Sequence, residues 1–212
     1  RRDYTFLITL GDSLLKHLPC SDYKWIIVYN SVSRPFFLEQ SKKLEYYFSS
    51  APPQILFCPQ PGKASSVYLG TSLVNTEYFL IMNDKDILLS NPLDKIVFYP
   101  PSSSDIGYSF PIKTNNSIIN YTETFSSSLI DAYHSKSISG DQLILYITSK
   151  SLEYFFPPLF NEPYLPEDVK HLLAHQDFCT YSFIPSYILS RKYLIDGITH
   201  NYDNNLRSSP FS

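Results

Sequence analysis

The sequence predicts an α/β protein built on a doubly wound, Rossmann-like, mostly parallel sheet flanked by helices. Two observations lead to this fold class. Strand-like and helix-like segments alternate through the first half of the chain. Two of the strand-like segments, residues 23–29 and 78–82, are apolar almost throughout, which is typical of parallel strands covered on both faces. The chain has 212 residues, of which 43% are hydrophobic, so it is long enough for one domain with a substantial core.

The first half of the chain follows a β-α-β-α-β-α-β order. Residues 4–9 are rich in residues that favour strands, and a helix with one leucine face follows until Pro19. The later elements show the same alternation; they are the strands 23–29, 54–58 and 78–82 and the helices 37–48 and 63–74. This order predicts right-handed crossovers and a ligand site beyond the carboxyl ends of the strands.

The second half is less regular and is expected to form a smaller, irregular region. Its elements are short and separated by polar segments; the candidates are the strands 105–111, 142–148, 178–184 and 188–193 and the helices 128–134 and 166–175. The helix 166–175 has a proline in its first turn, where proline is tolerated. Residues 113–124 form a polar, Asn-rich loop.

Composition excludes some classes of function. A net charge of -3 argues against nucleic acid as the main partner, because binding phosphate backbones needs clustered positive charge. Aromatic residues make up 16% of the chain, which suits a sugar, a partner or a membrane face, or equally reflects codon bias. No apolar run approaches the ~18 residues of a membrane-spanning helix.

The three scattered cysteines, Cys20, Cys58 and Cys179, fit neither a disulfide framework nor a zinc site. We interpret them as reduced thiols of a cytoplasmic protein.

The strongest candidate for a chemical site follows the buried strand 78–82. Two carboxylates, Asp84 and Asp86, flank Lys85 there, where a parallel sheet exposes its ligand edge. Carboxylates at such a place hold Mg²⁺ or Mn²⁺ against a diphosphate, because hard cations prefer oxygen ligands. The alternative interpretation is an acidic loop that caps the next helix.

Four weaker candidates accompany it. Gly62 and Lys63 stand between a strand and a helix, which suits an anion site at the helix N-terminus or a lysine in a surface turn. Glu167 and Asp168 stand at a helix start, where a carboxylate serves as a general base or simply favours the helix dipole. Gly140-Asp141 leads into a strand and has the local pattern of a turn. His171 and His175, four apart, suit a metal ligand pair or two exposed polar residues.

Taken together, these segments resemble the family 2 glycosyltransferases of the GT-A fold, in the bacterial branch that builds cell-surface polysaccharides. The strand 24–28 resembles the family's E-W-I-I-V-D-D-G-S strand, and residues 61–65 resemble its G-G-K-x-x-A turn. Residues 77–88 resemble its strand and metal loop, G-E-Y-I-x-x-L-D-S-D-D-I-L. Further likeness lies at Gly140-Asp141, Pro166-Glu167-Asp168 and residues 193–197. The resemblance runs over roughly residues 4–200.

Two family motifs are degenerate in this chain. Where the family has Asp-Asp-Gly-Ser, the chain has Tyr29-Asn30-Ser31-Val32, so the carboxylate that usually grips the base is missing. Aligned on Ile87-Leu88, the family's D-x-D becomes Asn83-Asp84-Lys85, with Asp86 after it.

The resemblance implies a glycosyltransferase that moves a sugar from a nucleotide-sugar donor to a glycan or lipid-linked acceptor, with inversion. By family position, Glu167 or Asp168 is the catalytic base, and Asp84 and Asp86 hold Mn²⁺ or Mg²⁺. The donor-binding positions are Tyr29, Asn30, Lys63, Asn83, Asp84, Lys85 and Asp141. Residues 1–100 are expected to form the nucleotide-sugar half of one domain, and residues 101–212 the acceptor half. The expected location is the cytoplasm, including the inner face of the membrane.

Three alternatives stay open at this point. In the first alternative, Lys63 and Lys85 take over the role of the metal, since a fixed ammonium also stabilises phosphate charge. In the second, the fold has lost catalysis and the protein acts as a partner or glycan-binding subunit. In a different class, the chain is a nucleotide-binding regulatory domain.

Overall fold

The computed structural model describes residues 4–19, 21, 23–115, 118–157 and 168–192. The chain divides into two compact units. The first unit contains residues 1–74 with 155–167 and 193–212, and the second contains residues 75–154 and 168–192. The functional halves expected at 1–100 and 101–212 stay a prediction.

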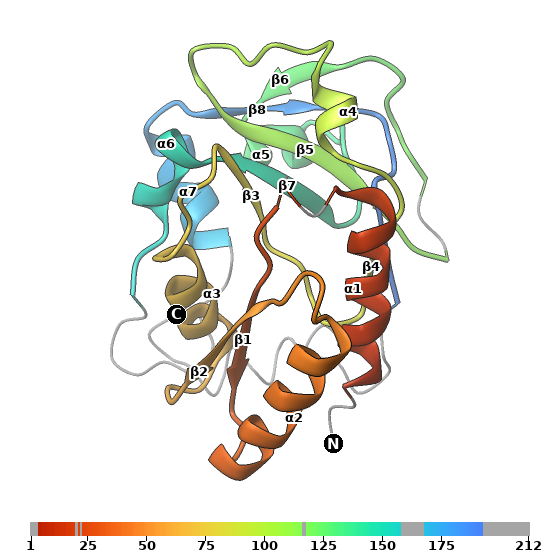
Figure 1. Cartoon of the computed structure of the whole chain (residues 1–212). Coiled ribbons are helices and arrows are strands. Elements are labelled where there is room, and N and C mark those ends of the chain that lie inside the picture. The colour runs from red at the N-terminus through yellow and green to blue at the C-terminus, as the bar shows by residue number, and fades with distance from the viewer. Residues whose placement is uncertain (1–3, 20, 22, 116–117, 158–167, 193–212) are drawn as a thin grey trace. The chain divides into compact units, whose positions relative to one another are not determined.

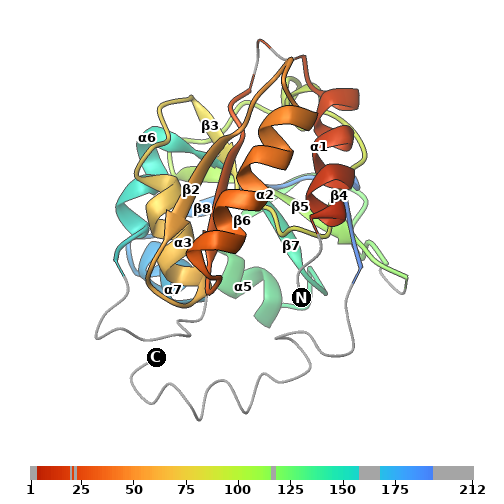
Figure 2. The ribbon, with the colours of Figure 1, turned by 60° about the horizontal axis from the view of Figure 1, so that its bottom comes forward.

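The first unit is a parallel strand pair with helices on both faces (Figures 1 and 2). Its elements are α1 (Thr5–His17), β1 (Ile26–Asn30), α2 (Arg34–Tyr47), β2 (Gln54–Cys58) and α3 (Lys63–Thr71). Ile27 packs with Leu44 of α2, whereas the neighbouring Val28 lies against α3, where a Cβ on Gly70 would be 3.4 Å away. Successive side chains of a strand point to opposite faces, so one strand supports a helix on each side. The parallel pairing expected from the sequence is confirmed here.

The predicted strand at residues 4–9 is wrong, because residues 5–9 belong to α1 and Tyr4 is its N-cap. Leu7, Leu10 and Leu14 are spaced three and four apart, so helical periodicity continues through a segment rich in strand-forming residues. Leu10 and Leu14 are buried and Leu7 packs against the core partly buried, so burial decides against local propensity. Gly11 lets the helix approach the core closely, since a Cβ there would lie 2.3 Å from Cζ of Phe48.

The second unit is a mixed sheet. Five strands lie side by side in the order β3 (Tyr78–Leu80), β7 (Gln142–Ile147), β5 (Asp105–Lys113), β8 (Thr180–Phe183) and β6 (Phe125–Ser127). Two further strands, β4 (Asp86–Leu88) and β9 (Leu189–Arg191), pair with each other, and β9 also pairs with β5. The β5–β8 and β5–β9 pairs are parallel, and the other pairs are antiparallel. The helical elements of this unit are α4 (Leu93–Ile96), α5 (Leu129–His134), α6 (Thr148–Ser151), η1 (Leu152–Tyr154) and α7 (Asp168–Gln176).

The α/β class with helices beside the sheet is confirmed, and the share of parallel pairing is smaller than the sequence predicts. The consecutive strands β1 and β2, which α2 connects, are parallel as expected. The next strand, β3, pairs instead with β7 in the second unit, and antiparallel. An apolar run indicates that a strand is covered on both faces, but it does not indicate whether the neighbouring strand is parallel or antiparallel.

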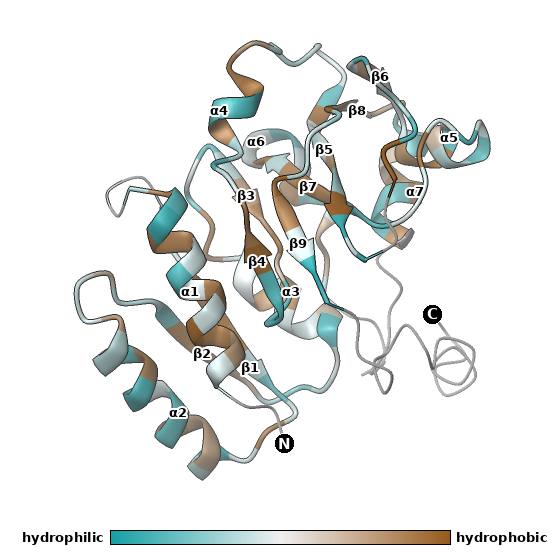
Figure 3. Cartoon of the chain, turned by 90° about the vertical axis from the view of Figure 1, so that its right-hand side faces the viewer, coloured by the Kyte–Doolittle hydropathy of each residue, from teal (hydrophilic) through white to brown (hydrophobic). Residues whose placement is uncertain are grey.

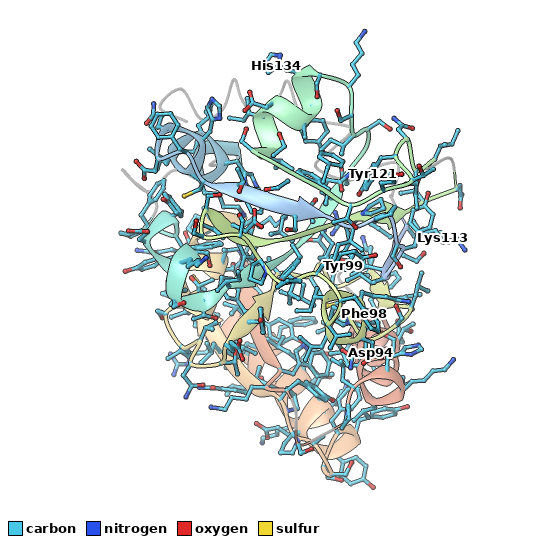
Figure 4. All side chains as sticks on the ribbon, turned by 90° about the horizontal axis from the view of Figure 1, so that it is seen from above. Asp94, Phe98, Tyr99, Lys113, Tyr121 and His134 are labelled. Carbon is cyan, nitrogen blue, oxygen red and sulfur yellow. The ribbon has the colours of Figure 1, made fainter. Side chains whose placement is uncertain are left out.

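The core of the second unit lies along β5 and β7. Residues 105–112 of β5 and 143–147 of β7 are all buried, and Figure 3 shows β7 largely in the hydrophobic colour. One charged side chain, Asp105, stands among these apolar residues at 1% exposure. In contrast, Phe98, just after α4, is 81% exposed (Figure 4).

Hydrogen bonds compensate the buried charge of Asp105. Its carboxylate accepts from four donors, which come from three segments of the unit: the Ser102 N–H at 2.8 Å and the hydroxyls of Ser126 at 2.8 Å, Thr180 at 2.6 Å and Ser182 at 2.8 Å. Burial alone would raise the pKa of this carboxyl, but the four hydrogen bonds, that from Thr180 foremost, hold the pKa below its ordinary value. Asp105 therefore joins β5, β6 and β8 at one end of the sheet.

Candidate functional site

In the first unit, the candidate residues lie at the carboxyl ends of the parallel strands. Asn30 ends β1, and its amide donates to the carbonyl of Gly62 and to the hydroxyl of Ser66. Gly62 has φ 97°, a conformation that favours glycine, and it directly precedes α3. The structure therefore brings Asn30 to the start of α3, the helix that Lys63 opens.

Tyr29 lies one position earlier in β1 and belongs to an aromatic cluster. Its ring meets Phe37 of α2 edge to face, with centroids 5.9 Å apart, and Phe37 contacts Phe57 of β2 at 5.2 Å. The Tyr29 ring therefore packs between the strands and α2, as an aromatic side chain is expected to do.

In the second unit, residues 83–86 form a tight turn, which we call the 83–86 turn. The Asp86 N–H donates to the Asn83 carbonyl at 3.0 Å, and the Asn83 N–H donates to Oδ2 of Asp86 at 2.8 Å. Asp84 and Lys85 occupy the two central positions between these bonds, where side chains of a four-residue turn project from the backbone. Both side chains are half-buried.

Asp86 begins β4, and its carboxylate is completely buried. Arg191 of β9 stands opposite it in the antiparallel ladder. Nε of Arg191 donates to Oδ1 at 2.7 Å and Nη2 donates to Oδ2 at 2.8 Å. This two-point geometry is the strongest form of arginine–carboxylate pairing. With the Asn83 N–H, three hydrogen bonds converge on one carboxylate.

The same guanidinium reaches a second carboxylate. Nη1 of Arg191 donates to Oδ2 of Asp141 at 3.2 Å, and this side chain is 50% exposed. Asp141 precedes β7 and follows Gly140, whose φ is +69°. Its carbonyl accepts from the Ile112 N–H at 3.0 Å, which ties the loop to β5; Lys113, the exposed last residue of β5, follows Ile112 (Figure 4).

The structure thus places five of the predicted residues, Asn83, Asp84, Lys85, Asp86 and Asp141, in one region of the second unit. Arg191, which connects two of them, was not a sequence candidate. It is 105 positions from Asp86, and the pairing depends on the register of β4 against β9. A strand of residues 188–193 was expected, but its partner strand was not.

The two proposed catalytic residues stand at the edge of the described chain. Glu167 lies outside the described residues. Asp168 is the first residue of α7, so its backbone position in a helix start is as expected, and the catalytic role stays a prediction.

The histidines of α7 have internal partners. His171 is buried, and its Nδ1 lies 2.9 Å from the hydroxyl of Tyr181. Nδ1 of His175 lies 3.0 Å from the Ser128 hydroxyl and 3.6 Å from Asp131. The interpretation of two exposed polar residues is wrong for His171, because its side chain is buried and its ring lies edge to face with that of Tyr181.

A divalent metal is the cofactor that the sequence predicts at Asp84 and Asp86. Asp86 does not fit this role, because both of its oxygens already accept hydrogen bonds from Arg191 and neither is exposed. Asp84, at the centre of the turn, is outside this ion pair. Across the described ranges, no group of three or more His, Cys, Asp or Glu side chains is arranged to hold a metal ion.

None of the helices in the described ranges is long and apolar enough to cross a membrane.

No family model matches the sequence. No curated protein sequence matches it either.

Solved structures of TarS from S. aureus resemble this chain. The complex of TarS 1-349 with UDP-GlcNAc matches with a TM-score of 0.65 and 13% identity, over 90% of this chain and 55% of that one. Another crystal structure of TarS 1-349 matches with a TM-score of 0.62 and 14% identity, over 95% of this chain and 59% of that one. The UDP complex matches with a TM-score of 0.60 and 15% identity, over 96% and 60%. The chain therefore has the fold of TarS and spans somewhat more than half of its 1-349 segment, in agreement with the fold expected from the resemblance to GT-A glycosyltransferases.

Proposed function

We propose that this chain is a glycosyltransferase domain that takes a sugar from a UDP-sugar and adds it to a glycan or lipid-linked acceptor. The observation that carries the proposal is the match of nine-tenths of the chain to the fold of TarS in a structure with UDP-GlcNAc bound. The family 2 resemblance of residues 24–28, 61–65 and 77–88 supports it as well, because these segments adjoin or contain Asn30, Lys63 and the 83–86 turn.

In the second unit, the 83–86 turn is the proposed site of the donor diphosphate. Lys85 supplies a cation at the centre of the turn, and Asn83 supplies an amide next to it. Polar and cationic groups fixed in place before the reaction stabilise a phosphate leaving group without reorganisation. Asp141, held by Arg191, lies in the loop before β7 and is proposed to contact the donor sugar.

In the first unit, Tyr29, Asn30 and Lys63 are the proposed donor-binding residues. The first turn of α3 offers backbone N–H groups and the positive end of the helix dipole. Asn30 supports this helix start through Gly62 and Ser66, so its contribution is to position α3 and Lys63.

The proposed reaction is a direct displacement with inversion. Glu167 or Asp168 accepts the proton of the acceptor hydroxyl. The hydroxyl oxygen forms a bond to the anomeric carbon as the bond from that carbon to the diphosphate oxygen breaks, and UDP leaves with the electron pair. The product belongs to cell-surface polysaccharide, made at the cytoplasmic face of the membrane.

The test is turnover. The purified chain is incubated with UDP-GlcNAc, UDP-glucose or UDP-galactose and an acceptor glycan library, and released UDP is measured. We expect one donor to release UDP faster with acceptor than without it. The absence of release from every donor, in a sample that binds UDP, would refute catalysis.

A second candidate function is a non-catalytic subunit that binds a glycan or a partner. It is favoured by one observation: two side chains at family motif positions, Asn30 and Asp86, are both bonded within the protein. This candidate predicts glycan binding by calorimetry with no UDP release under any condition.

A further inference from the structure

We propose that the 83–86 turn binds the diphosphate of its donor without a divalent metal, because Arg191 already provides the cation that neutralises Asp86. This inference rests on the proposed function and names the cation of that site. It starts from the carboxylate of Asp86 and the atoms around it.

The first step concerns the oxygens of Asp86. A metal ion needs carboxylate oxygens with an open approach. Oδ1 accepts from Nε of Arg191, and Oδ2 accepts from Nη2 of Arg191 and from the Asn83 N–H. The carboxylate has no exposed surface. A metal at Asp86 would have to displace a guanidinium that is bonded at two points.

The second step concerns how firmly that guanidinium is placed. Asp86 and Arg191 are opposite each other in the β4–β9 ladder. Two positions along, the same ladder pairs Leu88 with Leu189, and both leucines are buried. β9 also pairs with β5 through Leu189 and Ile112. The contact therefore follows from the backbone register of three strands, and the side chain of Arg191 is only 14% exposed.

The third step is the balance of charge. The region contains three carboxylates, Asp84, Asp86 and Asp141, and two cations, Lys85 and Arg191. Arg191 bonds two of the three carboxylates. Asp84 is the carboxylate of the turn outside that network, and Lys85 follows it directly, so a dication there would meet a neighbouring ammonium. Because Arg191 already bonds two carboxylates, the cation of the turn that we infer contacts the diphosphate is the Lys85 ammonium.

The experiment measures Mn²⁺ and UDP separately. Free Mn²⁺ is followed by electron paramagnetic resonance while the full chain is added, and UDP binding is followed by calorimetry in EDTA and in 2 mM Mn²⁺ (a concentration on the order of a weak metal site's Kd). We expect the free Mn²⁺ signal to be unchanged by the wild-type chain, and the Kd of UDP to agree within about threefold between the two buffers.

A variant gives the complementary result. Arg191→Met removes the guanidinium from Asp86 and Asp141, so this variant is expected to deplete free Mn²⁺ under conditions in which the wild type leaves the signal unchanged. Arg34→Met, at an exposed position of α2, is the matched control and is expected to leave Mn²⁺ binding unchanged. Circular dichroism checks that both variants are folded, and the wild-type results decide the proposal if Arg191→Met is not.

The proposal is overturned if the wild-type chain depletes free Mn²⁺ stoichiometrically, or if Mn²⁺ tightens UDP binding tenfold or more. If UDP binds in neither buffer, the proposed function fails, and the Mn²⁺ titration of the wild type still decides whether the turn is a metal site.

Discussion

The buried carboxylate of Asp105 offers the sharpest test of how the second unit is held together. The perturbation is Asp105→Asn, which keeps the shape and removes the charge. In the wild type every partner of this side chain is a donor, and each oxygen accepts two hydrogen bonds. The amide of Asn keeps one oxygen, so two of the four bonds lose their acceptor.

The expected cost follows from these bonds. A hydrogen bond to a charged group contributes about 1.5–3 kcal/mol, so two lost bonds alone amount to roughly 3–6 kcal/mol. If the amide nitrogen replaces Oδ1, the hydroxyls of Ser126 and Thr180 can rotate and accept from it, which recovers part of the loss. The backbone N–H of Ser102, bonded to Oδ2, has no such freedom and keeps the oxygen on its side. We expect a net loss of about 2–4 kcal/mol in the free energy of unfolding.

The effect should depend on pH with a defined sign. The pKa of Asp105 is lowered in the folded state, so its stabilisation is present above the unfolded value, near 3.8, and is lost as the pH falls through the folded value. The difference between wild type and Asp105→Asn should therefore be largest at neutral pH and shrink under acid.

The assay is urea unfolding followed by circular dichroism at pH 7 and in steps down to about pH 2, so that the titration passes below the unfolded pKa of an aspartate. Glu123→Gln, at an exposed loop position, is the control and should change stability by less than about 0.5 kcal/mol. An Asp105→Asn protein as stable as the wild type at pH 7, or a difference that grows under acid, would refute the reasoning.

Three further predictions concern other positions. Gly11→Ala places a Cβ 2.3 Å from Cζ of Phe48, so overpacking should cost about 1–3 kcal/mol in thermal unfolding, and an unchanged melting temperature would contradict the packing of α1. Lys85→Gln should weaken UDP binding in calorimetry by roughly tenfold, since one charge-assisted contact is lost; Lys95→Gln, on α4, is the control, and equal effects would show that the turn is not the diphosphate site. Asp168→Asn should lower kcat by about 10²–10⁴ with UDP affinity kept, if Asp168 is the general base, and a kcat within threefold of the wild type would remove it from that role.

Much of the fold was predictable because the spacing of apolar residues along the chain indicates which side chains are buried. The strands at 26–30, 54–58 and 105–113 and the helix that follows Ser128 lie where the sequence placed them. The prediction of a strand at residues 4–9 was wrong because the apolar residues of this segment also match a helical spacing. Packing of the leucine face of α1 against the core favours the helix over the strand. The antiparallel partner of β3 was not predictable, because a strand's own residues do not encode its neighbour's direction.

The candidate site was predictable in its loops and not in its contacts. The 83–86 turn and Asp141 follow from acidic residues beside apolar strands. Arg191 was missed because nothing local distinguishes an arginine in a strand from a surface arginine. Its partner is set by the register of β4 against β9, which depends on how the whole sheet assembles. The chemical assignment of Asp86 consequently changes from a metal ligand to one half of a buried ion pair.

The most direct test of the central claim is a calorimetric titration of UDP into the folded wild-type chain in EDTA, repeated with Lys85→Gln. A nucleotide-sugar domain of the kind proposed should bind one UDP with a Kd between about 1 μM and 1 mM, the usual range for enzyme substrates, and the variant should bind it more weakly. No heat of binding up to millimolar UDP, with or without Mn²⁺, would contradict the account.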